Sequence, residues 1–399
     1  MRYALIFILF VSLLEAQQFK TTVGLETIHI FQQYRVIDID TNMYTSEARA
    51  IVGLSFSPVF SGGNLSLSNN FGCGTKTIKD DLYATINRNF KNFMITTKLN
   101  FSGAIYTVDR PGYYDYAIGN LALSLSRNYK KLSAMISAHT GAKTNEITDY
   151  DYYEWGLGGS LNYNLNLTNR IRFYLSFDRR DYRGNFYKSY MRMYPGLSLE
   201  LLWGERSQAN FGVGYDARAV DKPYEAESNN TFTIQHDLSA HLGKDFFFIT
   251  NGNLDFRTYK VQDFVHYNYR ELSLLSGIKY DNFTLSLSFA PSLNYFNADT
   301  VYFAEPYYEF GFQAAFGIMK LKKIWFDITN EIGKRTYFNK TEFSFSTPYT
   351  YYNITLNGKL WIAKNITFNL FGNYSPEWHT NASENLVLTY ISGNIKYEF

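Results

Sequence analysis

The segment Thr355–Tyr374, TLNGKLWIAKNITFNLFGNY, contains two stretches in which apolar and polar residues alternate. Leu356 and Leu360 mark apolar positions of the first stretch, and Phe368 marks one of the second. Successive side chains of a β-strand point to opposite faces, so a period of two indicates strands with one apolar and one polar face. Only Ala363-Lys364-Asn365 separates the two stretches, and the segment therefore predicts a β-hairpin.

The same alternation recurs along the chain, for example in residues 93–105, 155–163, 171–177 and 283–289. Between consecutive short turns lie two strands and one longer loop rich in Tyr, Asn and Asp, such as 107–115 or 141–151. The short turns follow one another about 40 residues apart, with centres near Lys91, Lys130, Thr168, Glu205, Lys244, Asn282, Lys322 and Lys364. An earlier turn at 61–64 fits this series less well. Ten such up-and-down hairpins give about 20 strands in one domain, and 16 or 18 strands also fit.

The alternating runs are long, at about 10 to 14 residues, whereas strands of soluble proteins usually have roughly 5–6. A tilted strand needs about 9–11 residues to cross a bilayer. A soluble two-sheet sandwich is an alternative, but sequential hairpins without crossover signals favour a closed all-β barrel, antiparallel and transmembrane. In such a barrel the apolar face meets lipid and the polar face lines the lumen. We expect these residues to face lipid: Leu356, Leu360, Phe368 and Leu370. We expect these to face a watery interior: Asn357, Lys359, Thr367 and Asn369.

Aromatic residues gather at both ends of the expected strands. Trp203, Trp325 and Trp361 lie beside short turns. Tyrosines lie at the opposite strand ends: Tyr113, Tyr114, Tyr116, Tyr150, Tyr152, Tyr153, Tyr307, Tyr308, Tyr349, Tyr351 and Tyr352. Two aromatic girdles, one at each membrane interface, are typical of transmembrane barrels. Pro195 and Pro291 fall on the apolar face inside expected strands, where each removes a ladder hydrogen bond, so we expect bulges or strand ends there.

Composition and the first residues indicate an exported protein. Lys plus Arg number 38 and Asp plus Glu number 36, a balance that gives no reason to expect a nucleic-acid partner. The single cysteine, Cys73, cannot form an internal disulfide. Arg2, the apolar run Ala4–Leu14 and the site Leu14-Glu15-Ala16 indicate a signal peptide at 1–16, ahead of a barrel at 17–399. No later stretch approaches the ~20 apolar residues of a transmembrane helix.

The final segment, VLTYISGNIKYEF (387–399), places Val387, Ile391, Tyr397 and Phe399 on one face. It resembles the terminal strand of bacterial outer-membrane β-barrel proteins, which typically end in an aromatic residue read by the barrel-assembly machinery. The resemblance covers the whole mature chain in architecture. It implies a Gram-negative outer-membrane location, contact with outer-membrane lipid, and recognition of Tyr397 and Phe399 by that machinery. It also implies that the termini and short turns face the periplasm and that the longer loops face outward.

The residues do not form a recognisable catalytic signature. The sequence contains no metalloprotease, nucleophile-elbow or phosphate-loop motif. The best local set is Asp237, Ser239 and His241, which alternate along one expected strand about 7 Å apart and are too distant for direct hydrogen bonds. A catalytic site built on them requires partners from other strands. We therefore predict no enzymatic activity, and no metal or organic cofactor is implied.

Charged residues at expected lumen positions are the candidate functional residues. They are Glu26, Lys98, Arg172, Asp178, Arg180, Arg192, Arg218, Asp237, Arg257, Glu331 and Lys359. The mixture of signs predicts weak ion selectivity, unless the charges simply pair across strands. The favoured hypothesis is a porin-like aqueous channel for small polar solutes or one specific substrate. The alternative hypothesis is a non-enzymatic structural or assembly barrel whose lumen is filled by a periplasmic partner.

Overall fold

One continuous sheet accounts for most of the described chain. The computed structural model describes residues 19–36, 39–107, 114–184, 188–262, 266–299, 305–321, 323–338 and 346–398. The expected signal peptide at 1–16 lies outside these residues, as do Tyr113, Lys322 and Phe399. Within the described ranges, no helix is long and apolar enough to cross a membrane.

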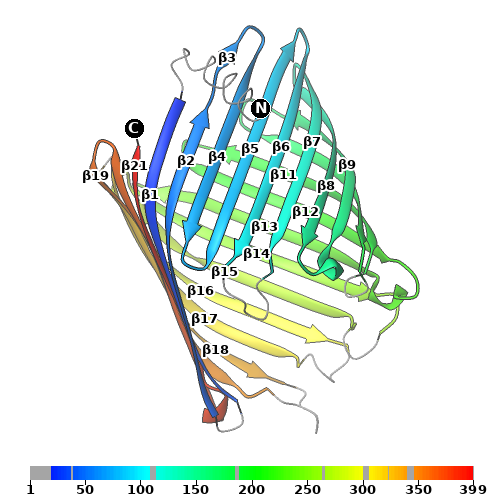
Figure 1. Cartoon of the computed structure of the whole chain (residues 1–399). Helices are drawn as coiled ribbons and strands as arrows, with labels where there is room; N and C mark the ends of the chain where they lie inside the picture. Colours follow the sequence, from blue (N-terminus) through cyan, green and yellow to red (C-terminus); the bar gives the residue numbers. More distant parts are fainter. Residues whose placement is uncertain are drawn as a thin grey trace.

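The strands follow one another as antiparallel neighbours around the sheet (Figure 1). They are β1 (Phe19–Val36), β2 (Ile39–Phe56), β3 (Val59–Phe60), β4 (Gly63–Gly74), β5 (Thr77–Phe90), β6 (Phe93–Tyr106), β7 (Tyr116–Tyr129), β8 (Leu132–Asn145), β9 (Tyr152–Asn164), β10 (Arg170–Tyr182), β11 (Tyr190–Trp203), β12 (Ser207–Val220), β13 (Asn229–Gly243), β14 (Phe246–Tyr259), β15 (Tyr269–Asp281), β16 (Leu285–Ala298), β17 (Tyr307–Lys320), β18 (Ile324–Tyr337), β19 (Tyr349–Ala363), β20 (Ile366–His379) and β21 (Leu386–Glu398). The described parts of the connections contain three short 3₁₀ turns: η1 (Thr148–Tyr150), η2 (Glu225–Glu227) and η3 (Ala382–Glu384).

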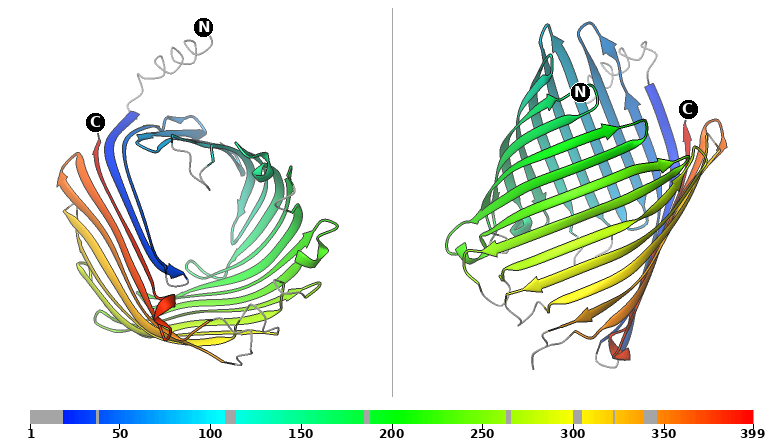
Figure 2. Two further views of the ribbon diagram at one scale, coloured as in Figure 1. Left: turned by 60° about the horizontal axis from the view of Figure 1, so that its bottom comes forward. Right: turned by 180° about the vertical axis from the view of Figure 1, so that it is seen from behind.

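The sheet closes on itself. β1 pairs with β21 from Thr22↔Glu398 to Tyr34↔Leu386, and Figure 2 shows the sheet winding round until these two strands lie side by side. β3 continues β2 against the same neighbour, β4, so the two count as one strand of a 20-stranded barrel. The prediction of a single all-β, up-and-down antiparallel barrel of about 20 strands is confirmed.

The hairpin that the alternating pattern predicts at 355–374 is present. Ala363 of β19 pairs with Ile366 of β20, so the turn is the two residues between them. Apart from Lys322, which lies outside the described residues, the other short turns also lie where the sequence places them, including the early one at Ser61-Gly62. At the opposite end, β6 ends at Tyr106 and β7 begins at Tyr116, as the predicted loop 107–115 requires, whereas residues 141–145 of the predicted loop 141–151 still belong to β8. Polar strand ends resemble loops in sequence, but their backbones continue the ladder.

The two prolines on the apolar face lie inside continuous strands, so the prediction of bulges or strand ends is wrong. Pro195 pairs with Leu175 of β10, and Pro291 pairs with Phe312 of β17. Toward its other neighbour each proline falls in a short gap in the ladder, after which the register resumes without a shift. Each N–H of a strand faces only one neighbour, so the missing N–H of a proline interrupts one ladder and leaves the other intact.

The barrel has an apolar outer wall and a polar inner wall. The Tyr351 hydroxyl of β19 donates to Glu309 of β17 at 3.1 Å, across the whole of β18. Side chains of non-adjacent strands converge in this way on a concave surface, which identifies the polar face as the inner one. Leu360 is 43 % exposed on the opposite face. The lipid-facing positions expected in the 355–374 hairpin lie on this outer wall: Leu356, Leu360, Phe368 and Leu370.

The aromatic girdles need a correction. Trp203 is exposed on the outer wall beside its turn, as expected. Trp325 and Trp361 instead share the inner wall with the polar residues, and the Lys359 ammonium lies 4.9 Å from the centre of the Trp361 ring. Their depth along the strand was predicted correctly, but their face was not, because each alternates with an outward isoleucine.

Candidate functional site: the inner wall of the barrel

The candidate charged residues lie on the inner wall, since each alternates with outward apolar neighbours. Several form ion pairs with an adjacent strand: Glu26–Arg49 at 2.7 Å, Arg180–Glu154 at 2.6 Å and Arg192–Asp216 at 2.6 Å. Asp178 of β10 lies 3.4 Å from the His139 Nε2 of β8, across Gly156 of β9. Arg257 donates to Thr231, and a Glu331 carboxylate oxygen lies 3.1 Å from the Tyr351 hydroxyl. Five other candidates form no ion pair within the described ranges: Lys98, Arg172, Arg218, Asp237 and Lys359. Contact of any of these residues with a solute stays a prediction.

Arginine side chains stack on tyrosine rings near the loop end of the inner wall. Their guanidinium carbons lie close to the ring centres: Arg180 over Tyr152 at 4.4 Å, Arg218 over Tyr190 at 4.1 Å, Arg257 over Tyr269 at 5.0 Å, and Arg335 over Tyr307 at 4.0 Å. We call these eight residues the Arg–Tyr belt. A cation over an aromatic face is attracted by the ring quadrupole. The stacking therefore fixes long side chains against the wall, where they narrow the lumen least.

Glu309 of β17 joins the belt to a hydrogen-bonded cluster. This carboxylate is 5 % exposed. It accepts hydrogen bonds from Arg335 at 2.7 Å, Asn294 at 2.8 Å and Tyr351 at 3.1 Å. The Tyr351 hydroxyl lies equally close to Glu331, at 3.1 Å. A buried carboxylate is costly unless it is paired and hydrogen-bonded. Arg335 of β18, Asn294 of β16 and Tyr351 of β19 meet that requirement for Glu309.

A polar recess lies further toward the short turns on the same wall. It has a volume of about 580 Å³. Amide, hydroxyl and carboxylate side chains of β11 to β15 line it: Ser198, Glu200, Asn210, Gln235, Asp237, Asn251, Asn253 and Ser273. They occupy two neighbouring rows of the sheet register, Ser198↔Gly212↔Gln235↔Asn253↔Ser273 and Glu200↔Asn210↔Asp237↔Asn251. Of the candidate residues, the recess contains Asp237.

Sequence reasoning missed both the Arg–Tyr belt and the recess. It assigned Tyr152, Tyr307 and Tyr349 to a lipid-facing girdle because they lie at strand ends. The signal that places them inside was present, since Tyr152 and Arg180, or Tyr307 and Glu309, have inward parity on their strands. The recess depends on which residues of five strands share a row, and that needs the register of each pair.

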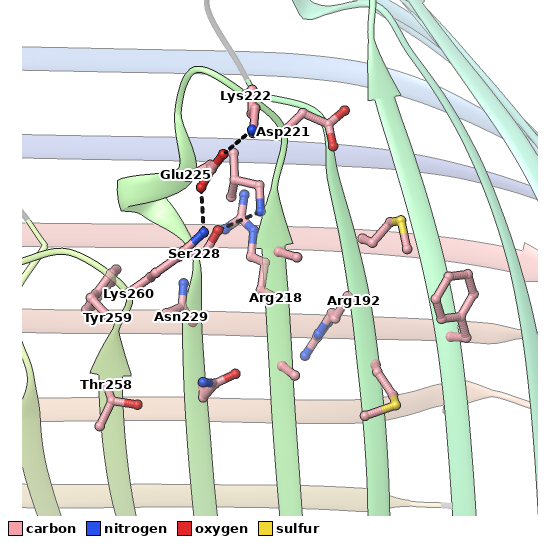
Figure 3. A pocket seen from close by; sticks show the side chains of 17 residues that line it. Arg192, Arg218, Asp221, Lys222, Glu225, Ser228, Asn229, Thr258, Tyr259 and Lys260 are labelled. Carbon is pink, nitrogen blue, oxygen red and sulfur yellow. Dashed lines mark hydrogen bonds and ion pairs between the residues drawn. The ribbon is translucent and has the colours of Figure 1, made fainter.

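A groove of about 820 Å³ lies at the loop end of β11 and β12, beside the loop that follows β12, and is lined by outward side chains together with the inward Arg192 and Arg218 (Figure 3). Met191 and Met193, each 42 % exposed, form part of its apolar side. At its upper edge Glu225 lies between Lys222 and Lys260. The hydrogen bond from Lys260, aided by its charge, lowers the pKa of the Glu225 carboxyl below its usual value. These contacts connect the loop to the end of β14.

Asp237, Ser239 and His241, the best local set of polar residues in the sequence, do not meet on the inner wall. The His241 ring nitrogen Nε2 lies 2.6 Å from the carbonyl of Lys244 in the adjacent turn, and its ring packs 5.1 Å from that of Phe247. Asp237 lines the recess, one row beyond Ser239. The described part of the chain holds no group of three or more His, Cys, Asp and Glu residues arranged to hold a metal ion.

Comparison with known proteins places the chain by fold. No family model matches the sequence, and no curated protein does. The siderophore receptor PirA from Pseudomonas aeruginosa superposes with a TM-score of 0.59 at 9 % identity, covering 96 % of this chain and 81 % of the receptor. A mutant of the ferric enterobactin receptor PfeA from the same organism gives a TM-score of 0.58 at 8 % identity, covering 95 % and 80 %. The copper transporter OprC gives 0.57 at 10 % identity, covering 96 % and 80 %. The chain therefore has the fold of bacterial outer-membrane β-barrel proteins, as its terminal segment and hairpin pattern predicted.

Proposed function

We propose that this chain is an outer-membrane protein of a Gram-negative bacterium whose barrel passes small polar solutes through its lumen. The observation that carries the proposal is the polar inner wall, which extends from the Arg–Tyr belt at the loop end to the recess nearer the short turns. Barrels of 16–18 strands leave an aqueous channel, and those of 22 strands are typically plugged. The 20-stranded wall described here lies between these sizes.

Weak ion selectivity follows from the pairing of charges along this wall. Arg180, Arg192 and Glu26 each face an opposite charge within 3 Å. A permeating ion therefore meets adjacent charges of both signs, and the pore discriminates little between cations and anions.

The proposed orientation places the short turns and both described termini in the periplasm and the Arg–Tyr belt toward the cell exterior. In the same orientation Tyr397, 40 % exposed on the outer wall of β21, is available to the barrel-assembly machinery. The outer wall contacts outer-membrane lipid. Export depends on the signal peptide at 1–16.

The test is single-channel recording of the refolded chain in a planar bilayer. Stable steps, with cation and anion permeabilities within about threefold of each other, are the expected result. A folded barrel that stays silent in the bilayer and co-purifies with a periplasmic protein would refute the channel. That outcome supports instead a structural or assembly barrel filled by its partner.

A further inference from the structure

Two tyrosine rings lie flat against the inner wall, between the Arg–Tyr belt and the recess. Tyr174 of β10 and Tyr194 of β11 have ring centres 5.6 Å apart, with planes inclined by 35°. Each ring covers a glycine on the next strand. A Cβ at Gly196 would lie 2.1 Å from Cζ of Tyr174, and a Cβ at Gly214 would lie 2.8 Å from the hydroxyl oxygen of Tyr194.

The glycines explain the orientation of the rings. Gly196 is the direct cross-strand partner of both Tyr174 and Gly214. In this register row across β10, β11 and β12, only Tyr174 carries a side chain. A glycine inside a strand often marks a place where another group must approach the backbone closely. Here the approaching groups are rings, and each turns one π-face to the lumen. The two rings thus form a small flat aromatic surface on the wall, which we call the Tyr174–Tyr194 surface.

The Tyr174–Tyr194 surface adjoins the recess along β11. Gly196 and Ser198 are two residues apart on β11, about 7 Å along the strand, and Ser198 lines the recess. Gln235 lies over Gly212 in the same way that the tyrosines lie over their glycines, since a Cβ at Gly212 would be 2.7 Å from its side-chain nitrogen. Amide groups both donate and accept hydrogen bonds. The aromatic surface therefore adjoins side chains that can hydrogen-bond a hydroxyl group either as donor or as acceptor.

The charges around this surface nearly cancel. Arg192 pairs with Asp216, and Arg170 pairs with Glu200. Arg172 and Asp237 are one of each sign. Asp255 and Glu271, in the register row of Tyr174 and Gly196, exceed Arg257 in the next row by one charge. A charged solute therefore gains little electrostatic binding energy here. A solute ring with an apolar C–H face and hydroxyl groups at its rim matches both the aromatic surface and the polar recess. We propose that the Tyr174–Tyr194 surface and the recess form a binding site for an uncharged saccharide. The proposal rests on the proposed channel and names its solute class.

The first experiment measures binding without requiring conduction. The chain refolded in detergent is titrated with maltotriose, cellotriose and raffinose by calorimetry, beside glucuronate and arginine as charged solutes. At least one neutral saccharide should bind, and the charged solutes should not. The variant Tyr174→Leu/Tyr194→Leu should weaken that binding about tenfold, since two stacking faces are lost. The control Tyr215→Leu removes a tyrosine that is 38 % exposed on the outer wall and should leave affinity unchanged.

The second experiment repeats the titration on single channels. The saccharide that binds should interrupt the current in a concentration-dependent manner, and the double variant should remove the interruptions. Binding by none of the three saccharides, or equal binding by wild type and double variant, would overturn the saccharide site even if the barrel conducts. Tyrosine-dependent binding by a barrel that never conducts would instead refute the proposed channel and leave the saccharide site standing.

Discussion

Gly196→Ala should destabilise the barrel although alanine is normally better tolerated than glycine in a strand. The added methyl group would lie 2.1 Å from Cζ of Tyr174, whereas carbon atoms that pack well are separated by roughly 3.5–4.0 Å. The ring must therefore move by about 1.5 Å and leave the wall. Overpacking of this kind costs about 1–3 kcal/mol, which outweighs the roughly 0.5–1 kcal/mol that alanine gains over glycine by restricting the unfolded chain.

The control is Gly317→Ala, on the inner wall of β17. There the nearest atoms to the added Cβ are Ser286 Cβ at 3.5 Å and Asp327 Cβ at 3.9 Å, which are ordinary contacts. This variant should be neutral or slightly stabilising. The free energy of unfolding is measured by urea titration of the refolded barrel in lipid vesicles, followed by tryptophan fluorescence. Gly196→Ala should lower it by about 1–2 kcal/mol relative to Gly317→Ala.

A double-mutant cycle identifies the cause. In a Tyr174→Ala background the ring is absent, and Gly196→Ala should become as harmless as Gly317→Ala, with a coupling energy of about 1–2 kcal/mol. Gly196→Ala that matches the control in the wild-type background would refute the flat placement of the ring. A cost that persists without the ring would place the strain in the backbone instead.

Other predictions concern ion pairs, pH and permeation. Arg335→Met leaves the buried Glu309 carboxylate without its cation, and the free energy of unfolding should fall by roughly 2–4 kcal/mol in urea titrations, much of which Glu309→Gln should restore in the same chain. Because its folded-state pKa is lowered, Glu225 stabilises the docked loop above its unfolded pKa of about 4.3, and this contribution is lost as pH falls through the folded value; Glu225→Gln at pH 7 should increase amide hydrogen exchange in that loop, and unchanged exchange would contradict the ion-pair role. Lys98→Glu should raise the ratio of cation to anion permeability, measured from the reversal potential in a salt gradient, and Asp237→Lys should lower it. Two variants with the wild-type ratio would show that neither side chain faces the permeation path.

Strand positions and turns could be predicted from the sequence because both depend on local patterns. The alternation around Leu360 and Phe368 and the short turn between them specify a hairpin without knowledge of the rest of the chain. Strand ends were misplaced where polar residues continue the ladder, as in 141–145 of β8. A backbone needs only an extended partner to pair, so the composition of a strand end does not report where pairing stops.

The contents of the inner wall could be predicted only in part. Parity along a strand places Arg180 and Asp237 inside, and the structure has them there. Parity also places Tyr307 inside, but its position near a strand end favoured an outward girdle and that inference was wrong. Contacts between strands, such as the Tyr174 ring over Gly196, depend on the register of each pair, and one sequence does not contain that register in readable form.

The closure between β1 and β21 has a consequence for the order in which the barrel assembles. Among the described strands, every other pairing joins neighbours in the sequence, with β2 reaching β4 past the two-residue β3. Each of those pairings closes a small loop, whereas Thr22↔Glu398 closes almost the entire chain, at an entropic cost of about 5 kcal/mol from loop length alone. That seam should therefore form last and open first. The hydrogen-bonded pairing between β1 and β21, rather than the combined stability of the hairpins, then determines the unfolding rate of the finished barrel.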